Sequence, residues 1–336
     1  MPPIKLGIIG CGIAANKLHW TALQKIRDQF EITAVCNNTE PKAKAFAQKV
    51  GGVPYVLDYR ELLQRPDIEA VDIALPIQLN CEIAKDSLSA GKHVIVEKPM
   101  AANRQQAQAM LEYEKRFEQV KMVAENFHYH KGFLRVRELI RGGIIGVPFA
   151  AFWDVFRRID ANNPYAQTQW RIEHEYPGGF VLDGGVHFIA ALRLIFGDII
   201  AGQAFTKSVN PNIGEIDSCS FQFETPGDVH GVLNLYFSVD GISKNQLVVL
   251  GKEGTLFLEN TENLIVRKAE EVVLEETIDC DWGYREEFED FFQAIRFGKP
   301  VEVSFAQAYR DLDVMISALE SAKRWHDFRL GTKLLR

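Results

Sequence analysis

The 336-residue sequence predicts two domains, an α/β domain followed by an α+β domain. Over residues 1–125, short apolar runs alternate with helical patterns, and a glycine-rich turn follows the first run. This arrangement predicts a Rossmann-type domain, a doubly wound parallel sheet. Over residues 126–336, short strands with few helices predict an open, mostly antiparallel sheet that helices cover on one face.

The first domain is expected to contain six strands joined by amphipathic helices, as in consecutive βαβ units. The strands are expected at Ile4–Ile9, Ile32–Cys36, Val53–Val56, Ala70–Ala74, His93–Val96 and Met122–Ala124. The helices are expected near Ala14–Arg27, Lys42–Lys49, Leu79–Ala90 and Arg104–Phe117.

The second domain is expected to begin with a helix at Gly132–Arg141 and a strand at Phe149–Phe156. Short strands are then expected at Phe221–Phe223, Val229–Phe237, Gln246–Leu250, Thr255–Leu258, Leu264–Val266 and Val272–Leu274. Two amphipathic helices, Glu286–Arg296 and Phe305–Arg324, end the pattern, and the second is expected to pack back on the first domain.

The strand near Val229–Phe237 carries apolar side chains on both alternate faces, with Val232 and Tyr236 opposite Leu233 and Leu235. A strand of this kind is expected to be covered on both sides. Helices would cover one side and a partner subunit the other, so we expect a homodimer or homotetramer formed through the open face of the sheet.

Composition excludes several classes of function. The net charge of −7 argues against a nucleic-acid backbone as partner. No uninterrupted apolar stretch approaches about 18 residues, so no membrane span is expected, and the N-terminus shows no signal-peptide organisation. The cysteines are too widely spaced for a zinc site, so we expect no metal, and reduced thiols in a cytoplasmic protein. They are Cys11, Cys36, Cys81, Cys219 and Cys280.

The glycine-rich turn lies between the first expected strand and the first expected helix, where a dinucleotide fingerprint belongs. Gly10 permits the tight turn, and Gly12 lets the backbone approach a pyrophosphate. Ile13 and Ala14 then open the helix, whose free amides favour an anion. Ala15 stands where a small residue allows close packing of helix and strand. The alternative is a glycine-rich turn without a ligand.

The end of the second strand bears on which dinucleotide binds. A site for NAD places an acidic residue about 20 residues after the glycines, on the ribose 2′-hydroxyl. Here Asn37 and Asn38 occupy that turn, and no carboxylate occurs until Glu40. No arginine stands at the turn to attract a 2′-phosphate either. Either NAD or NADP is therefore compatible with the sequence, which leans slightly to NADP.

Lys98 follows an apolar strand directly, in the tripeptide Glu97-Lys98-Pro99. A lysine just past the carboxyl end of such a strand points into the crevice where open α/β sheets bind ligands. Lys98 is therefore a candidate for chemistry on a substrate beside the dinucleotide. A solvated lysine in a turn that ends at proline is the alternative.

A second candidate constellation lies in the segment from Pro177 to His187. If a helix starts near Asp183, then Asp183 and His187 are neighbours on one helix face, and Asp183 caps the helix. A histidine that faces a substrate suits general acid–base chemistry near neutral pH. A capping aspartate with a buried structural histidine is the alternative.

Together these motifs resemble the glucose–fructose oxidoreductase / inositol dehydrogenase / MocA (Gfo/Idh/MocA) family of nicotinamide-dependent dehydrogenases. The resemblance covers almost the whole chain. It rests on Gly7–Ala14, Ala74–Pro76, Glu97–Met100, Leu139–Pro148, Trp170-Arg171, Gly178–His187, Glu286–Pro300 and Asp311–Ala322.

The resemblance implies roles for particular residues. Lys98 would bind the substrate hydroxyl, Asp183 and His187 would complete the catalytic site, and Trp170 and Arg171 would lie near nicotinamide and substrate. Leu75, Pro76, Asn80, Glu97 and Asn126 join the expected cofactor site, and Tyr165 joins the substrate site. The chain departs from the usual family pattern at Leu75, Asn80, Ala190 and Asn37.

The expected function is hydride transfer between the nicotinamide of NAD(P) and a secondary alcohol or ketone of a sugar, polyol or related diol. His187 is expected to accept the alcohol proton and Lys98 to hold the oxygen, although either could transfer the proton. Arg157-Arg158 is either a solvated strand end or a recognition element for an acidic or hydroxylated substrate. The alternatives are a cofactor-binding regulator without turnover and an NAD-dependent glycosidase or lyase.

Overall fold

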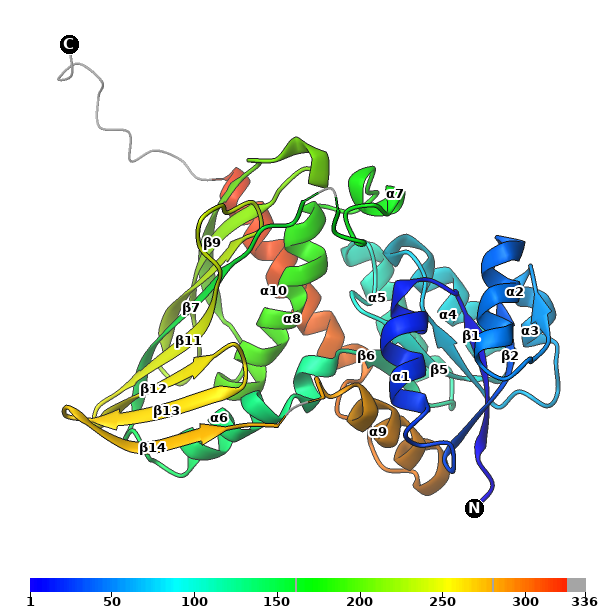
Figure 1. Ribbon diagram of the computed structural model, residues 1–336, viewed down its shortest axis with the longest axis horizontal. Coiled ribbons are helices and arrows are strands. Elements are labelled where there is room, and N and C mark those ends of the chain that lie inside the picture. The colour runs from blue at the N-terminus through cyan, green and yellow to red at the C-terminus, as the bar shows by residue number, and fades with distance from the viewer. Residues whose placement is uncertain (161, 280, 325–336) are drawn as a thin grey trace, which may run out of the picture.

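The computed structural model describes residues 1–160, 162–279 and 281–324, so Cys280 lies outside the described residues. Two sheets form the cores of two lobes, and helices α8, α10 and α9 lie between and beneath them (Figure 1). Both parts of the predicted fold class are confirmed: one sheet is parallel, and the other is mostly antiparallel.

The first sheet has six parallel strands in the order β3-β2-β1-β4-β5-β6. The order reverses between β1 and β4, which creates a crevice at the carboxyl ends of these strands. The strands are β1 Ile4–Ile9, β2 Phe30–Cys36, β3 Tyr55–Val56, β4 Ala70–Ile73, β5 His93–Glu97 and β6 Lys121–Ala124.

The four predicted helices of this domain occur in the predicted order, but the first differs in form and the short helix α3, Tyr59–Leu63, was not predicted. The expected helix Ala14–Arg27 is a π-helical turn followed by one short α-helical turn that ends at Leu23. The π-turn contains His19, which is fully buried and bonded to Asp72 of β4. The elements are η1 Ala14–His19, α1 Trp20–Leu23, α2 Glu40–Lys49, α3 Tyr59–Leu63, η2 Ile77–Leu79, α4 Asn80–Ser89 and α5 Arg104–Arg116.

The second sheet has eight strands in the order β14-β13-β12-β11-β7-β10-β9-β8. Only the β7–β10 pair among these is parallel. The sequence missed β8, an edge strand whose side chains are mostly exposed and which therefore lacks an apolar pattern. The strands are β7 Pro148–Phe156, β8 Ala201–Lys207, β9 Ser218–Glu224, β10 His230–Tyr236, β11 Lys244–Gly251, β12 Gly254–Glu259, β13 Asn263–Lys268 and β14 Glu271–Thr277.

Helices α8 and α10 cover one face of this sheet, and α10 also lies against α5 of the first domain (Figure 1). Arg104 of α5 forms ion pairs with Asp313 and Glu320 of α10. The remaining elements are η3 Asn126–Tyr129, α6 Lys131–Arg141, α7 Gln169–Ile172, α8 Gly179–Phe196, η4 Pro211–Ile213, α9 Tyr284–Phe297 and α10 Phe305–Lys323.

Helix α8 begins four residues earlier than predicted, so the expectation that Asp183 caps this helix is wrong. Gly178 adopts a left-handed conformation with φ of 81° and starts the helix, which continues through the buried residues Phe180–Leu182. Asp183 consequently lies inside the helix rather than at its end. By length and composition α8 could cross a membrane, but 83% of that window is buried in the molecule, as in the core helix of a globular domain.

Candidate functional site

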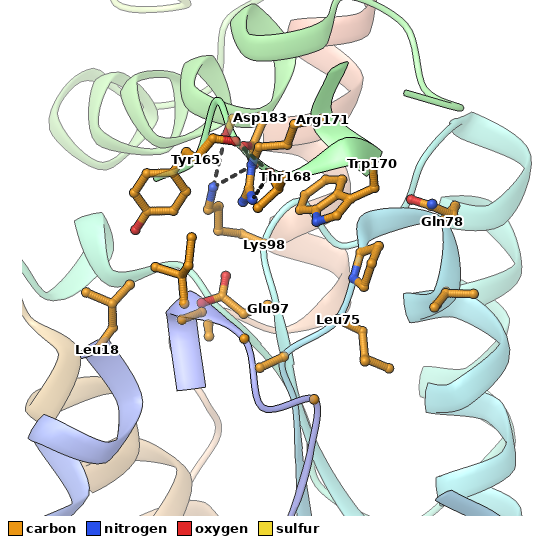
Figure 2. A pocket seen from close by; sticks show the side chains of 18 of the residues that line it. Leu18, Leu75, Gln78, Glu97, Lys98, Tyr165, Thr168, Trp170, Arg171 and Asp183 are labelled. Carbon is orange, nitrogen blue, oxygen red and sulfur yellow. Dashed lines mark hydrogen bonds and ion pairs between the residues drawn. The ribbon is translucent and has the colours of Figure 1, made fainter. Parts of the chain in front are cut away.

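A cavity of about 1330 Å³ opens at the carboxyl ends of the parallel strands, between the two domains. The predicted site residues line it, with the exception of Asn80. Figure 2 shows Tyr165, Trp170, Arg171 and Asp183 of the second domain facing Lys98 and Glu97 of the first. The others that line it are Gly10, Gly12, Ile13, Ala14, Asn37, Asn38, Leu75, Pro76, Asn126 and His187.

The glycine turn is shaped for close approach of a ligand. At Gly10, φ is +103° and a Cβ atom would lie 2.2 Å from the Ala74 carbonyl oxygen, so no larger residue fits. At Gly12, a Cβ atom would meet no protein atom within 4 Å. Gly12 is therefore not required by packing and leaves open space beside the backbone, as a bound pyrophosphate needs.

Asn37 supports this turn from the end of β2. Its side-chain oxygen accepts a hydrogen bond from the Cys11 amide at 3.1 Å. The Cys11 thiol is buried, and burial together with Cys36 raises its pKa to about 12, so it is not a reactive thiolate. The cavity next to Asn37 and Asn38 is lined by two cations, Lys42 and Arg60.

The Glu97-Lys98-Pro99 turn is held by Asn80. The Asn80 amide donates to the carbonyl oxygens of Glu97 at 2.9 Å and Pro99 at 3.0 Å, across a cis Lys98–Pro99 peptide. Asn80 is fully buried beneath the turn. Asn80 therefore supports the turn that carries Lys98 and does not itself face the cavity.

Lys98 and Asp183 join the two domains at the centre of the cavity. Lys98 Nζ donates to the Asp183 backbone oxygen at 2.9 Å and to Oδ1 at 3.0 Å, while Arg171 Nε donates to Oδ2 at 2.8 Å (Figure 2). Although burial opposes both shifts, Asp183 raises the pKa of Lys98, and Lys98 and Arg171 lower the pKa of Asp183. Both groups are thus charged at neutral pH.

Two aromatic rings flank the Arg171 guanidinium. Its central carbon lies 3.9 Å from the ring centre of Trp170 and 4.9 Å from that of Tyr165. Cation–π contacts of this kind hold the planar group in one orientation. The predicted Trp170-Arg171 pair thus forms a wall of the cavity beside Lys98.

His187 is oriented by a carboxylate that the sequence analysis did not identify. His187 Nδ1 lies 2.5 Å from Glu125 Oε1, and Phe127 stacks on the imidazole with ring centres 4.6 Å apart. If Nδ1 donates its hydrogen to Glu125, then Nε2 is an acceptor. Glu125 follows β6 directly, and a carboxylate at the carboxyl end of a predicted strand was the signal that could have found it.

A buried cluster lies beneath the cavity, and the sequence did not predict it either. His19 Nδ1 hydrogen bonds to Asp72 at 2.8 Å, and Nε2 lies 2.9 Å from Glu97. Although burial opposes it, these carboxylates raise the pKa of His19 well above its ordinary value. Glu97 is thereby fixed next to Lys98 by a histidine that never reaches the cavity.

Comparisons with known proteins agree with this geometry. The family model for oxidoreductases with an NAD-binding Rossmann fold matches residues 4–125, and that for the GFO/IDH/MocA C-terminal domain matches residues 133–257. The Saccharomyces cerevisiae protein YMR315W is 31% identical over 88% of each chain.

Further similarity extends to named enzymes and solved structures. The myo-inositol 2-dehydrogenase of Thermotoga maritima is 24% identical, over 90% of this chain and 91% of that one. The crystal structure of a Thermotoga maritima oxidoreductase superposes with a TM-score of 0.91 and 35% identity, covering 95% of this chain and 97% of the other.

Proposed function

Because this chain belongs to the GFO/IDH/MocA family of NAD(P)-dependent oxidoreductases, we propose that it oxidises a secondary alcohol of a sugar, polyol or related diol, or reduces the ketone. The observation that carries the proposal is the meeting of Lys98, Asp183 and His187 in the cavity that the glycine turn also lines. A cation and a base at one end of a dinucleotide crevice are what hydride transfer from a carbinol requires.

The residues at the glycine turn fit the dinucleotide. Gly12 leaves space for the pyrophosphate, and Leu75 and Pro76 line the cavity between the turn and Lys98. The bound nicotinamide supplies the acceptor or donor of the hydride. The protein has to bind the carbinol oxygen, orient it and move one proton.

Lys98 binds the substrate oxygen in this proposal. Its ammonium is charged at neutral pH and therefore cannot accept the alcohol proton, but it can stabilise an alkoxide as the proton leaves. His187 Nε2 accepts that proton, and the Glu125 carboxylate stabilises the imidazolium that results. Asp183 keeps Lys98 and Arg171 in place and orients the substrate between them.

We further propose NADP(H) as the preferred cofactor. Asn37 and Asn38 stand where a carboxylate would repel a 2′-phosphate, and Lys42 and Arg60 line this end of the cavity. The Arg60 guanidinium lies 3.4 Å from Asp58 and 3.9 Å from Glu82. A 2′-phosphate can draw on both cations, whereas a free ribose gains less from them.

The open face of the second sheet supports a proposal about assembly. A row of apolar side chains crosses five paired strands there, on the face opposite α8 and α10. It comprises Val232, Phe152, Val248, Phe257 and Ile265. We propose that a second copy covers this row in a homodimer or homotetramer. Light scattering should show an oligomer for the wild type and a monomer for Phe152→Lys.

We propose a cytoplasmic location because the described cysteines, Cys11, Cys36, Cys81 and Cys219, are free and buried. Unpaired thiols are the usual state in a reducing compartment. Cell fractionation with an antibody against the chain tests this, and recovery of the protein from the periplasm or the medium would contradict it.

The reaction is tested with the purified protein and a panel of sugars and polyols. Nicotinamide absorbance should change with at least one alcohol or its ketone, and thermal shift should show stabilisation by NADP(H).

Lys98→Met and His187→Ala should each lower kcat at least 100-fold, which is the low end for loss of a proton-transfer group, with cofactor binding retained. Near-normal kcat in both variants would overturn the mechanism. Product formation without net nicotinamide change would indicate a lyase or glycosidase.

A further inference from the structure

Arg157 is a cation in the cavity that hydride transfer itself does not require. It follows β7 directly, and the side chains at alternate positions of this segment, Trp153, Val155 and Ile159, are buried on the helix-covered face. Arg157 shares that direction and lines the cavity together with Ile159 and Phe237. Its neighbour Arg158 points the other way and pairs with the exposed Asp240 at 2.6 Å.

The Arg157 guanidinium lacks the anion that the other arginines of the cavity have. Arg171 is paired with Asp183, and Arg60 with Asp58. Across residues 1–160, 162–279 and 281–324, no carboxylate lies within ion-pair distance of Arg157. The Arg157 residue is exposed, so its guanidinium is accessible to a ligand. Partial desolvation by the surrounding chain lowers its pKa, and no neighbouring anion opposes this.

The carboxylates that share the cavity are occupied or lie apart from Arg157. Asp183 is neutralised by Lys98 and Arg171, and Glu97 is close to His19. Glu173 accepts a hydrogen bond from Gln169 at 3.0 Å. Glu175 also lines the cavity, but it forms no ion pair with Arg157 in the described chain. A guanidinium in this situation is available to an anion from outside the protein.

We propose that Arg157 binds an anionic substituent, a carboxylate or a phosphate, on the alcohol or ketone whose oxygen Lys98 and His187 engage. The inference rests on the proposed function, since the anionic group belongs to the same substrate. The reacting carbon would lie beside Lys98, and the anionic group would lie near the end of β7. The planar guanidinium forms two parallel hydrogen bonds to either group, which a hydroxyl cannot match. The preferred substrate is therefore an acidic or phosphorylated polyol rather than a neutral sugar.

Matched compounds test this directly. D-Glucuronate, D-glucose 6-phosphate and D-glucose, with the corresponding galactose compounds, are assayed with NADP and NAD in the wild type and Arg157→Met. In the wild type we expect kcat/KM to favour a charged member over its neutral counterpart. In Arg157→Met that ratio should fall roughly 10- to 100-fold, mainly through KM, as for loss of a charged hydrogen bond. The carboxylate and phosphate arms show which anion is preferred.

Two further variants separate recognition from packing. Arg157→Lys retains the charge without the two parallel bonds, so it should retain part of the preference. Arg158→Met removes a neighbouring cation that points away from the cavity, and it should leave the ratio unchanged. The proposal is overturned if the wild type uses neutral compounds equally well or better, or if Arg157→Met lowers both members of each pair alike.

Failure of the proposed reaction is distinguishable from failure of this inference. If the wild type turns over none of the compounds, the same panel is measured as ligands by thermal shift with NADP present. Stabilisation by a charged member alone, lost in Arg157→Met, supports the anion site without the reaction. Absence of any charge-dependent stabilisation overturns the anion site.

Discussion

Replacing Glu125 by glutamine tests the orientation of His187 most directly. The variant keeps the size of the side chain and an oxygen able to accept from the Phe127 amide, which now donates to Oε1 at 3.2 Å. It removes only the negative charge next to the imidazole. The folded structure should therefore persist, while the positive charge that His187 would gain in the proposed reaction loses its partner.

The size of the effect follows from the geometry. The Nδ1–Oε1 distance is 2.5 Å, and the side chains of His187 and Glu125 are 19% and 2% exposed. Opposite charges about 4 Å apart near a protein surface interact by about 4 kcal/mol, which corresponds to roughly 10³-fold in rate. General base catalysis contributes about 10²–10⁴-fold in total. We expect Glu125→Gln to lower kcat by roughly 10²–10³-fold.

Steady-state kinetics with the substrate found in the panel would measure this, with NADP(H) affinity followed by thermal shift. A change in kcat with little change in KM or cofactor affinity indicates a role in proton transfer. The matched control is Glu287→Gln. Glu287 does not line the cavity, and burial raises the pKa of its carboxyl well above the ordinary value, so its replacement should change kcat little. A loss of less than threefold in kcat for Glu125→Gln would refute the reasoning.

Three other changes follow from the structure. His19→Leu leaves Asp72 and Glu97 as buried, unpaired carboxylates and should destabilise the fold by about 3–5 kcal/mol in denaturant unfolding. In the wild type, the pKa of His19 is higher in the folded protein than in the unfolded chain. The stabilisation from His19 is therefore full below about pH 6.5, the pKa in the unfolded chain, and is lost only as pH rises through the folded pKa. Gly12→Val fills open space, so the thermal midpoint without ligand should change little while stabilisation by NADP(H) is lost. Asn38→Asp places a carboxylate at the end of the cavity with Lys42 and should lower the ratio of kcat/KM for NADP to that for NAD by about tenfold or more.

The parts of the site that the sequence predicted are those that a local pattern specifies. Gly10 and Lys98 each follow a strand of the parallel sheet, and the carboxyl ends of such strands meet at one edge. That rule places both residues in one crevice without any knowledge of the side chains. The fold class was predictable for the same reason, since strands and helices alternate with clear hydrophobic patterns.

The parts that the sequence did not predict depend on contacts between distant segments. Glu125 and His187 are 62 positions apart, and their pairing depends on how η3 packs against α8. The early start of α8 depends on Gly178, where a Cβ atom would lie 2.4 Å from Leu319 of α10. The position of Glu125 at the end of β6 could have marked it as a candidate, but no local rule specifies either contact. The edge strand β8 lacks a hydrophobic pattern because most of its side chains face solvent.

The bond between Lys98 and Asp183 explains why the site requires both domains. An ammonium group has three hydrogens to donate, and Asp183 accepts two of them, through its backbone oxygen and Oδ1. One hydrogen remains for a substrate oxygen in the cavity, and its direction is fixed by the other two. Because Asp183 lies on α8 and Lys98 follows β5, a shift of one domain against the other would turn the third hydrogen away from the substrate. In the proposed reaction, the ion pair would therefore align the carbinol oxygen with the nicotinamide, in addition to joining the two domains.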